Sequence, residues 1–530
     1  MGVALWGCSS SRPPAAARVT CLDVSTTSLT HYDRMSTDFL DEATRHPTTN
    51  VDGEVVWNTR YYLESLLTAY EATGNPKYIQ SFLDTGTSVM NLVKTVSVTN
   101  VPDPTFPGAT GPEILETGWP TQLSNFATPV PVPTADGKTS LFAQSLLPGG
   151  GAQDFQVTQQ ADGSLQLSWL DENDLPLQTY TVKSLSDLQA LTAQPLFSEP
   201  ANAFLQSQSL GRIIATGGGL PAPGLYLRGA VEETVWNMQS GGILLPFAEF
   251  LLLARSKPGL APVSTVAQWT STVLSISGSY EDQFNPDGSG GLRFHNPQWL
   301  PNPVADLDAP ADYVFVEARL RLLLYKLTGD PHHLAIAKGL ALHQQSFHFQ
   351  ANKDGWLELK FWPCVVSWTS RAGAPAGSIW DSFQYDPSSP APSTDASFAA
   401  DFLDSAQKYG LVSQLGIDPA SYAHQQAAFT RYMLRDDSSA LFGPQGVMRT
   451  NFPTSTSRKS DPVVYSADPF SAAAWIPREL SDRFFGNIYW NWMTQYGQSP
   501  QNYPVGYFLR AWARAEAARM SSCQASQANP

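Results

Sequence analysis

Residues 70–79 read YEATGNPKYI, and residues 325–334 read YKLTGDPHHL. In both stretches a Thr-Gly pair follows an aromatic residue and precedes an Asn or Asp and a proline. Glycine tolerates the left-handed conformation that ends many helices, and proline fits the first turn of the next helix. Apolar residues recur before each stretch at three- and four-residue spacing, as on one face of a helix. Each stretch therefore predicts a tight turn between two helices.

Helical hairpins of this kind are expected along most of the chain. The first runs from Glu54 to Gly74 and from Pro76 to about Lys94, and the second spans residues 311–348. We expect a third from Glu232, a fourth within residues 395–434 and a closing helix at residues 502–520. The spacing between hairpins is irregular and the loops are rich in Pro, Gly and Trp, which argues against a regular solenoid.

One region follows a different pattern. Residues 154–183, DFQVTQQADGSLQLSWLDENDLPLQTYTVK, alternate apolar and polar side chains around Asp162-Gly163 and Asn173-Asp174. Alternation broken by such pairs indicates strands joined by turns. We therefore predict a small antiparallel β-insertion at about residues 138–195 of a helical body.

The composition limits the choice of partners. The chain has 530 residues, a formal net charge of −15 and only 15% charged residues, against about a quarter in average soluble proteins. A negative field repels polyphosphate, so nucleic acid is not an expected partner. Polarity comes instead from Ser, Thr, Gln and Asn beside 15 Trp, 19 Tyr and 26 Phe. This balance favours an exported protein that binds neutral, hydroxyl-rich ligands.

The N-terminus and the cysteines bear on localisation. MGVALWGCSSS resembles the end of a bacterial lipoprotein signal with Cys8 as the lipidated residue, but it lacks the basic and full hydrophobic regions of one. A lipid anchor at Cys8 and an accidental likeness both stay open, and residues 1–30 are interpreted as a signal remnant and tether. The four cysteines match no zinc spacing, although a bridge between Cys21 and Cys523 would join the chain ends. The expected location is periplasmic, cell-surface or secreted.

Repeated hairpins with long loops, the TG[ND]P turn and the segment DGWLELKFWP resemble the α/α-toroid carbohydrate-active enzymes. These include glycoside hydrolases, polysaccharide lyases and uronyl epimerases. The resemblance implies a mainly α fold over residues 31–530, an incomplete or six-hairpin α/α toroid, with a carbohydrate substrate over its inner helices. It matches no single family residue by residue.

A glycosidase needs two carboxyl groups, one protonated and one ionised. EVVWN at residues 54–58 returns as ETVWN at residues 233–237, which places Glu54 and the pair Glu232 and Glu233 before apolar helices. Glu232 and Glu233 are candidate catalysts. The alternative is that acidic groups at these positions only complement the helix dipole, and the spacing does not decide between the two.

Three aspartates are further catalytic candidates because each lies near an expected helix start or beside an aromatic residue: Asp312, Asp381 and Asp395. Each is equally well explained as a turn or cap residue. The loop EILETGWPTQ contains Glu116, for which a catalytic acid and a residue of a surface loop are equally good interpretations.

Aromatic and polar side chains near these carboxyls are candidate substrate-binding residues: Trp119, Trp236, Arg293, His295, Trp299, Tyr313 and Trp380. Lyases and epimerases use Tyr or His with an Arg or Asn that neutralises the uronate, and GLRFHNPQWLPNP supplies such a cluster around Arg293 and His295, with Tyr280 or Tyr313 as partners. NPDGSGG lacks the closing Glu of a calcium loop.

No P-loop, dinucleotide fingerprint, nucleophile elbow or HExxH occurs, so we expect no cofactor and no metal. The sequence thus favours a glycoside hydrolase acting on a neutral or weakly charged glycan. A polysaccharide lyase or uronyl epimerase, and a surface glycan-binding lipoprotein without catalysis, are the alternatives. Oligomeric state, sugar, linkage and stereochemistry are left open.

Overall fold

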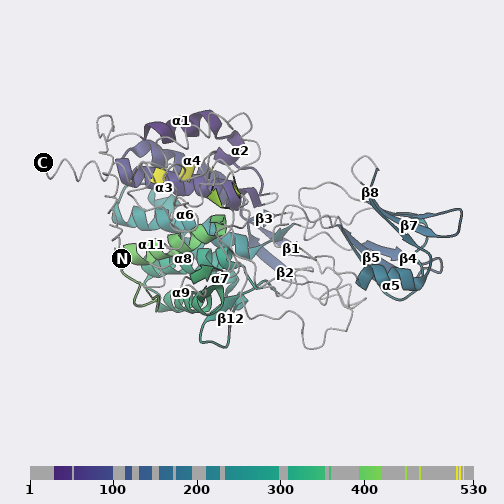
Figure 1. The fold of residues 1–530 in the computed structure, drawn as a ribbon. Coiled ribbons are helices and arrows are strands. Elements are labelled where there is room, and N and C mark those ends of the chain that lie inside the picture. The colour runs from purple at the N-terminus through teal and green to yellow at the C-terminus, as the bar shows by residue number, and fades with distance from the viewer. Residues whose placement is uncertain are drawn as a thin grey trace, which may run out of the picture.

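The computed structural model places a helical body beside a smaller β-module (Figure 1). Described residues are 29–50, 53–98, 114–121, 130–145, 154–170, 175–193, 211–226, 233–297, 308–351, 357–359, 393–418, 448–449, 465–466 and six helical residues between 506 and 517. The helices are α1 (Thr30–Phe39), α2 (Glu42–Arg45), α3 (Arg60–Thr73), α4 (Pro76–Asn91), α5 (Leu185–Ala193), α6 (Asn237–Ser256), α7 (Val263–Ser279), α8 (Ala311–Thr328), α9 (Pro331–His343) and α11 (Ser393–Lys408). The described part of the chain is thus mainly α with small antiparallel sheets, as predicted.

The repeated stretch forms the same turn in both places. Gly74 ends α3 at φ 67°, and its N–H donates to the carbonyl of Tyr70. Asn75 then caps α4 by accepting from the N–H of Lys77. Gly329, at φ 78°, and Asp330 perform these roles between α8 and α9. Both predicted turns are confirmed. Glycine ends each helix because a residue without a Cβ takes the left-handed conformation without strain.

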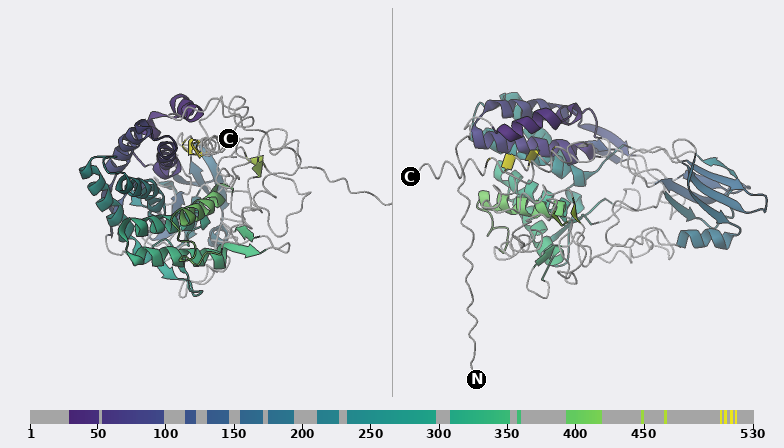
Figure 2. Two further views of the ribbon diagram at one scale, coloured as in Figure 1. Left: turned by 90° about the vertical axis from the view of Figure 1, so that its left-hand side faces the viewer. Right: turned by 45° about the horizontal axis from the view of Figure 1, so that its top comes forward.

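Three hairpins, α3–α4, α6–α7 and α8–α9, lie side by side and follow an arc (Figure 2). Helices α3, α6, α8 and α11 pack on one another in that order, while α4, α7 and α9 each cover one of the first three. Every residue of α8 from Ala311 to Leu324 is buried, whereas α4 and α7 expose one face. The hairpins therefore have an inner and an outer layer.

The predicted helix starts differ in detail. The first helix opens with a π-helical turn, η2 (Val55–Thr59), before α3. The third begins at Asn237, because Thr234–Val235 form strand β11 in place of a helical turn. After α9 a second π-helical turn, η5 (Gln344–His348), completes the predicted span.

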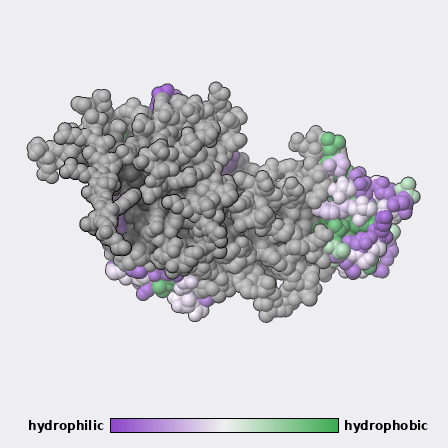
Figure 3. All heavy atoms as spheres, in the orientation of Figure 1, coloured by the Kyte–Doolittle hydropathy of each residue, from purple (hydrophilic) through white to green (hydrophobic). Residues whose placement is uncertain are grey.

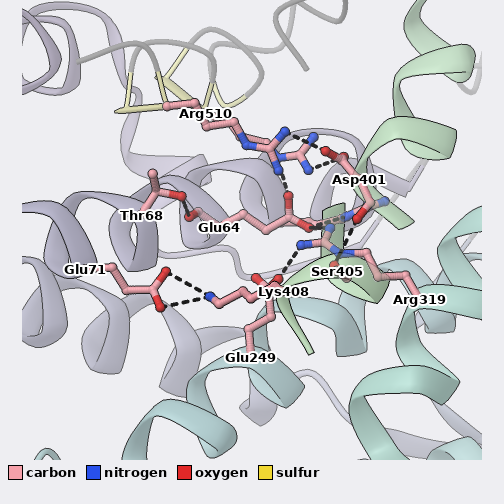
Figure 4. Close-up of polar contacts among 11 residues, drawn as sticks. Glu64, Thr68, Glu71, Glu249, Arg319, Asp401, Ser405, Lys408 and Arg510 are labelled. Carbon is pink, nitrogen blue, oxygen red and sulfur yellow. Dashed lines mark hydrogen bonds and ion pairs between the residues drawn. The ribbon is translucent and has the colours of Figure 1, made fainter. Parts of the chain in front are cut away.

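The C-terminal segment lies between α3 and α11, at the open side of this series. Gly506 donates its N–H to Oδ1 of Asn58 at 2.8 Å. Arg510 forms ion pairs with Glu64 of α3 and Asp401 of α11 (Figure 4). Burial alone would raise the pKa of Asp401, but Arg510 and further arginines hold it well below its usual range. The last helical residues therefore join the two ends of the inner layer.

More ion pairs extend this buried network across the inner helices. Arg319 of α8 contacts Glu64 at 3.3 Å, Glu249 of α6 and Ser405 of α11 (Figure 4). Burial opposes ionisation of Glu64, but the arginines around it lower its pKa overall. Because a buried charge is stable only when paired, the network fixes how the inner helices face one another.

The β-module has its own hydrophobic core of Val132, Leu141, Phe155, Leu167, Trp169 and their neighbours. One sheet has the order β10-β6-β7-β8 and another the order β4-β5-β9, with α5 beside them; all pairs are antiparallel. The bounds are β4 Val130–Pro133, β5 Thr139–Ser145, β6 Phe155–Gln159, β7 Leu165–Leu170, β8 Pro176–Val182, β9 Gly211–Ala215 and β10 Gly224–Tyr226. On the face shown in Figure 3, the described surface of the β-module carries hydrophobic and hydrophilic patches next to one another.

The strands of the module extend beyond the predicted residues 138–195 on both sides. Gly163, at φ 82°, forms the turn predicted between β6 and β7. β3 (Pro120–Thr121) pairs with β11 (Thr234–Val235), so the chain leaves and re-enters the helical body at adjacent points. The module is thus an insertion joined through a two-stranded stem.

Short hairpins complete the described chain: β1 (Lys94–Val98) with β2 (Ile114–Gly118), β12 (Phe284–Pro286) with β13 (Leu292–Phe294), β14 (Phe349–Ala351) with β15 (Leu357–Leu359), and β16 (Met448–Arg449) with β17 (Tyr465–Ser466). A short 3₁₀ turn, η4 (Glu281–Gln283), precedes β12. Among the described helices, none is long and apolar enough to cross a membrane. Cys8, Cys21 and Cys523 lie outside the described residues.

Candidate functional site

The starts of three inner helices meet at one end of the helical body. Trp57 precedes α3, Trp236 caps α6 and Tyr313 lies in the first turn of α8. Near the other end, Glu71 of α3 contacts Lys408 of α11 at 3.0 Å. The inner helices therefore run in the same direction and present their N-terminal ends together, where the partial positive charge of helix dipoles accumulates.

Three aromatic rings form the centre of this end, and we call them the aromatic cluster. The ring of Trp57 lies 5.9 Å from that of Tyr313, and the ring of Trp236 lies 5.4 Å from it. Both tryptophans are partly exposed, whereas Tyr313 is buried beneath them. The two Trp-Asn pairs of the repeated EVVWN and ETVWN segments are therefore brought together in space.

Glu116 contacts the first residue of α6, which follows Trp236 of the aromatic cluster in the chain. It is on β2, and its Oε2 accepts from Nδ2 of Asn237, the residue after Trp236, at 3.4 Å. Burial raises the pKa of Glu116 to about 7; the hydrogen bond from Asn237 opposes this shift and the negative charge of Asp282 adds to it. A carboxyl of this kind is protonated in a large fraction of molecules at neutral pH and can donate a proton.

Asp312 and Arg60 lie deeper, next to Tyr313 and one turn beyond Trp57. The Asp312 side chain is only 3% exposed, and that of Arg60 is 2%. Burial raises the pKa of Asp312 to about 7, against the opposing effects of backbone N–H groups and of the Arg60 charge. Arg60 Nε lies 3.4 Å from Glu64, which ties this pair to the buried ion network.

The loop around β13 supports the cluster from the side. Nε1 of Trp236 donates to Oδ1 of Asn296 at 2.8 Å, and Nδ1 of His295 lies 2.8 Å from the Asn296 carbonyl. Arg293 forms an ion pair with the buried Asp308 at 2.6 Å. Arg293 and His295 therefore hold the loop that positions Asn296 against Trp236.

The other predicted site residues occupy different places. Glu233 is at the surface, where it pairs with Lys94 at 2.7 Å. Glu54 is exposed and makes no side-chain cap bond. Trp119 is 2% exposed and donates to the carbonyl of Val89, so its ring packs in the core.

The remaining predicted residues are not placed at the site. Glu232, Trp299, Trp380 and Asp381 lie outside the described residues. Asp395 has helical backbone in the first turn of α11, and its side chain is not among those described. Of the carboxyls that the sequence analysis considered, the structure brings Asp312 and Glu116 to this end of the helical body within the described chain.

Sequence reasoning missed two contributors to this site. Asp282 lies in SYEDQFNPDG without any pattern that marks it, because its proximity to Glu116 depends on the path of the chain after α7. Trp57 did carry a signal, since it is the counterpart of Trp236 in the repeated segment. Attention to the aromatic residue of the repeat, in place of its glutamate, would have found it.

Comparison with known proteins assigns no reaction to this arrangement. No protein-family model and no curated protein matches the sequence. A D-mannose isomerase structure is similar over 97% of this chain and 100% of its own, at 10% identity and a TM-score of 0.39. A glycoside hydrolase family 76 mannosidase from Bacteroides thetaiotaomicron is similar over 88% of both chains, at 10% identity and a TM-score of 0.29. Likenesses this distant assign neither a reaction nor a substrate to the chain.

Proposed function

We propose that this protein is a glycoside hydrolase that acts on a neutral or weakly charged glycan, built on an α/α toroid. The inner layer of α3, α6, α8 and α11, joined at its open side by the segment around Arg510, supports the toroid. The glycan would bind at the N-terminal ends of these helices, against the aromatic cluster.

The proposal of a hydrolase rests mainly on Glu116. Its half-buried carboxyl has a pKa of about 7 and lies beside Asn237, the neighbour of Trp236. Cleavage of a glycosidic bond requires a proton on the leaving oxygen, and a carboxyl supplies it best when its pKa is near the working pH. Glu116 is therefore assigned the role of general acid.

Hydrolysis also needs an ionised carboxylate to assist the attack on the sugar. Asp282 is exposed, and its negative charge contributes to the raised pKa of Glu116. A carboxyl of raised pKa with a second carboxyl group nearby is the arrangement that acid–base hydrolysis uses. We assign Asp282 as the carboxylate that activates water or attacks the sugar.

The internal contacts of Arg293 and Tyr280, two residues that a lyase or epimerase would use, make that alternative less favourable. Such enzymes need a cation or amide for the uronate carboxylate and a free Tyr or His as base. Arg293 is paired with Asp308. Tyr280 is fully buried and donates to Glu317 at 3.1 Å, and burial raises its pKa further. Both groups are engaged in internal contacts.

Digestion of a glycan panel with the purified protein separates these functions. New reducing ends without ultraviolet absorbance are expected from hydrolysis. An absorbing, unsaturated product would show a lyase and would overturn the assignment. A protein that is only retarded on a glycan affinity gel, with no product from any glycan in the panel, would be a binding protein.

A further inference from the structure

Two buried polar groups at the site lack hydrogen-bond partners among the described residues. Nη2 of Arg60 and Oδ1 of Asp312 are both fully shielded from solvent and neither makes a hydrogen bond there. A buried donor or acceptor without a partner costs about 1–3 kcal/mol, and more when it is charged. Such groups are retained where a ligand or bound water completes them.

The surroundings hold both groups in place. The Arg60 guanidinium lies 4.8 Å from the ring centre of Tyr61 and 5.1 Å from that of Phe398. A Cβ at Gly242 would come within 3.0 Å of Nη1, so the glycine leaves room for the guanidinium. Asp312 lies in the first turn of α8, where backbone N–H groups oppose the rise in its pKa. The orientation of the unpartnered atoms is therefore built into the helices.

We propose that Arg60 and Asp312 bind hydroxyl groups of a terminal sugar, so that the enzyme acts on chain ends or on short oligosaccharides. This inference rests on the proposed hydrolase function and specifies its mode of action. A sugar on the aromatic cluster would direct its far hydroxyls to Arg60 and Asp312 and its glycosidic oxygen to Glu116.

A hydroxyl matches the two groups better than an anion does. Arg60 offers only a donor, and ionised Asp312 offers only an acceptor. A sugar hydroxyl accepts from the first and donates to the second, whereas a carboxylate or phosphate would place its negative charge beside Asp312. The pair therefore selects neutral, polyhydroxylated ligands.

Burial of the pair determines which part of a glycan can reach it. Both side chains are at most 3% exposed, whereas Trp57, one turn before Arg60 in the chain, is partly exposed. An internal residue of a polymer continues in both directions, so it cannot enter a position that is closed on one side. A chain end or a short sugar can.

The test uses a neutral oligosaccharide from the panel with both ends free, with the non-reducing end blocked or with the reducing end blocked, and the products are separated by size over time. A single smallest product from the start, with loss of activity when one of the two ends is blocked, is expected. A mixture of all chain lengths from the first minutes would overturn the inference while leaving the hydrolase standing.

Variants separate binding from folding damage. Asp312→Asn and Arg60→Gln should each raise KM at least about tenfold, whereas the exposed counterparts Asp38→Asn and Arg34→Gln should leave it unchanged. Unaltered KM in Asp312→Asn, with normal circular dichroism, would show that a bound water completes the pair and would refute the inference.

If no glycan is hydrolysed, sugar binding can still be measured directly by adding monosaccharides to the protein and following its tryptophan fluorescence. Saturable quenching that Asp312→Asn weakens supports the sugar pocket independently of catalysis. No quenching by any monosaccharide overturns both proposals.

Discussion

Replacing Asp312 by Asn should stabilise the protein above neutral pH and leave its stability in acid unchanged. Burial moves the pKa of this carboxyl from 3.8 to about 7. Because the folded-state pKa is raised, folding is favoured by protonation, and this contribution is lost as pH rises from about 4 to about 7. At about 1.36 kcal/mol for each pKa unit, ionisation of Asp312 costs about 4 kcal/mol of stability at pH values well above 7.

Asparagine has nearly the same shape and carries no charge, so the variant avoids this cost. Urea unfolding followed by helical ellipticity should show the variant more stable than wild type by up to about 4 kcal/mol at about pH 8. The difference should vanish near about pH 2.5, well below the ordinary Asp pKa of 3.8, where Asp312 is protonated in both the folded and the unfolded state. Asp38→Asn, an exposed change, serves as the control for the assay.

A stability difference between variant and wild type that is the same at both pH values would refute this reasoning. It would show that folding does not raise the pKa of Asp312. A less stable variant at high pH would show that the Arg60 charge outweighs burial. The predicted gain in stability accompanies the loss of sugar binding expected for the same variant, as is common where a site is built at the expense of stability.

Other perturbations test the site and the contact of the C-terminal segment with α3 and α11. Arg510→Gln leaves an oxygen of Glu64 and one of Asp401 without their partner, so urea unfolding should show a loss of about 3 kcal/mol; a loss near zero would mean that the C-terminal segment does not join the inner helices. Activity should fall as pH rises above about 7, because Glu116 loses its proton there, and a rate that is flat to high pH would exclude Glu116 as the acid. Trp236→Ala removes a ring of the aromatic cluster and should raise KM about tenfold with little change in kcat, whereas an unchanged KM would place the sugar elsewhere.

The helical hairpins could be predicted from the sequence because local chemistry decides them. Gly74 and Gly329 each end a helix through a conformation that depends on a single residue, and the following Asn or Asp caps the next helix. The alternation around Asp162-Gly163 predicted the strands of the β-module for the same reason.

The candidate site was predicted less well because it depends on contacts between distant segments. Glu233 and Asp312 have the same sequence signature, an acid near a helix start, yet one pairs with Lys94 at the surface and the other is buried among the inner helices. Burial, which gives Asp312 and Glu116 their raised pKa values, comes from packing between hairpins that no local pattern encodes. The repeat itself was a correct signal, but its tryptophans, not its glutamates, meet in space.

The most direct test of the proposed hydrolase compares Glu116→Gln with wild type on two substrates of the same sugar. One carries its natural sugar leaving group, and the other an acidic phenol that departs without protonation. Glu42→Gln, an exposed change, is the matched control. Loss of a general acid should lower kcat/KM on the natural substrate by about 10²–10⁴ while sparing most of the activity on the phenol glycoside. Equal losses on both substrates, or no loss on either, would contradict the assignment of Glu116 as the acid that cleaves the glycosidic bond.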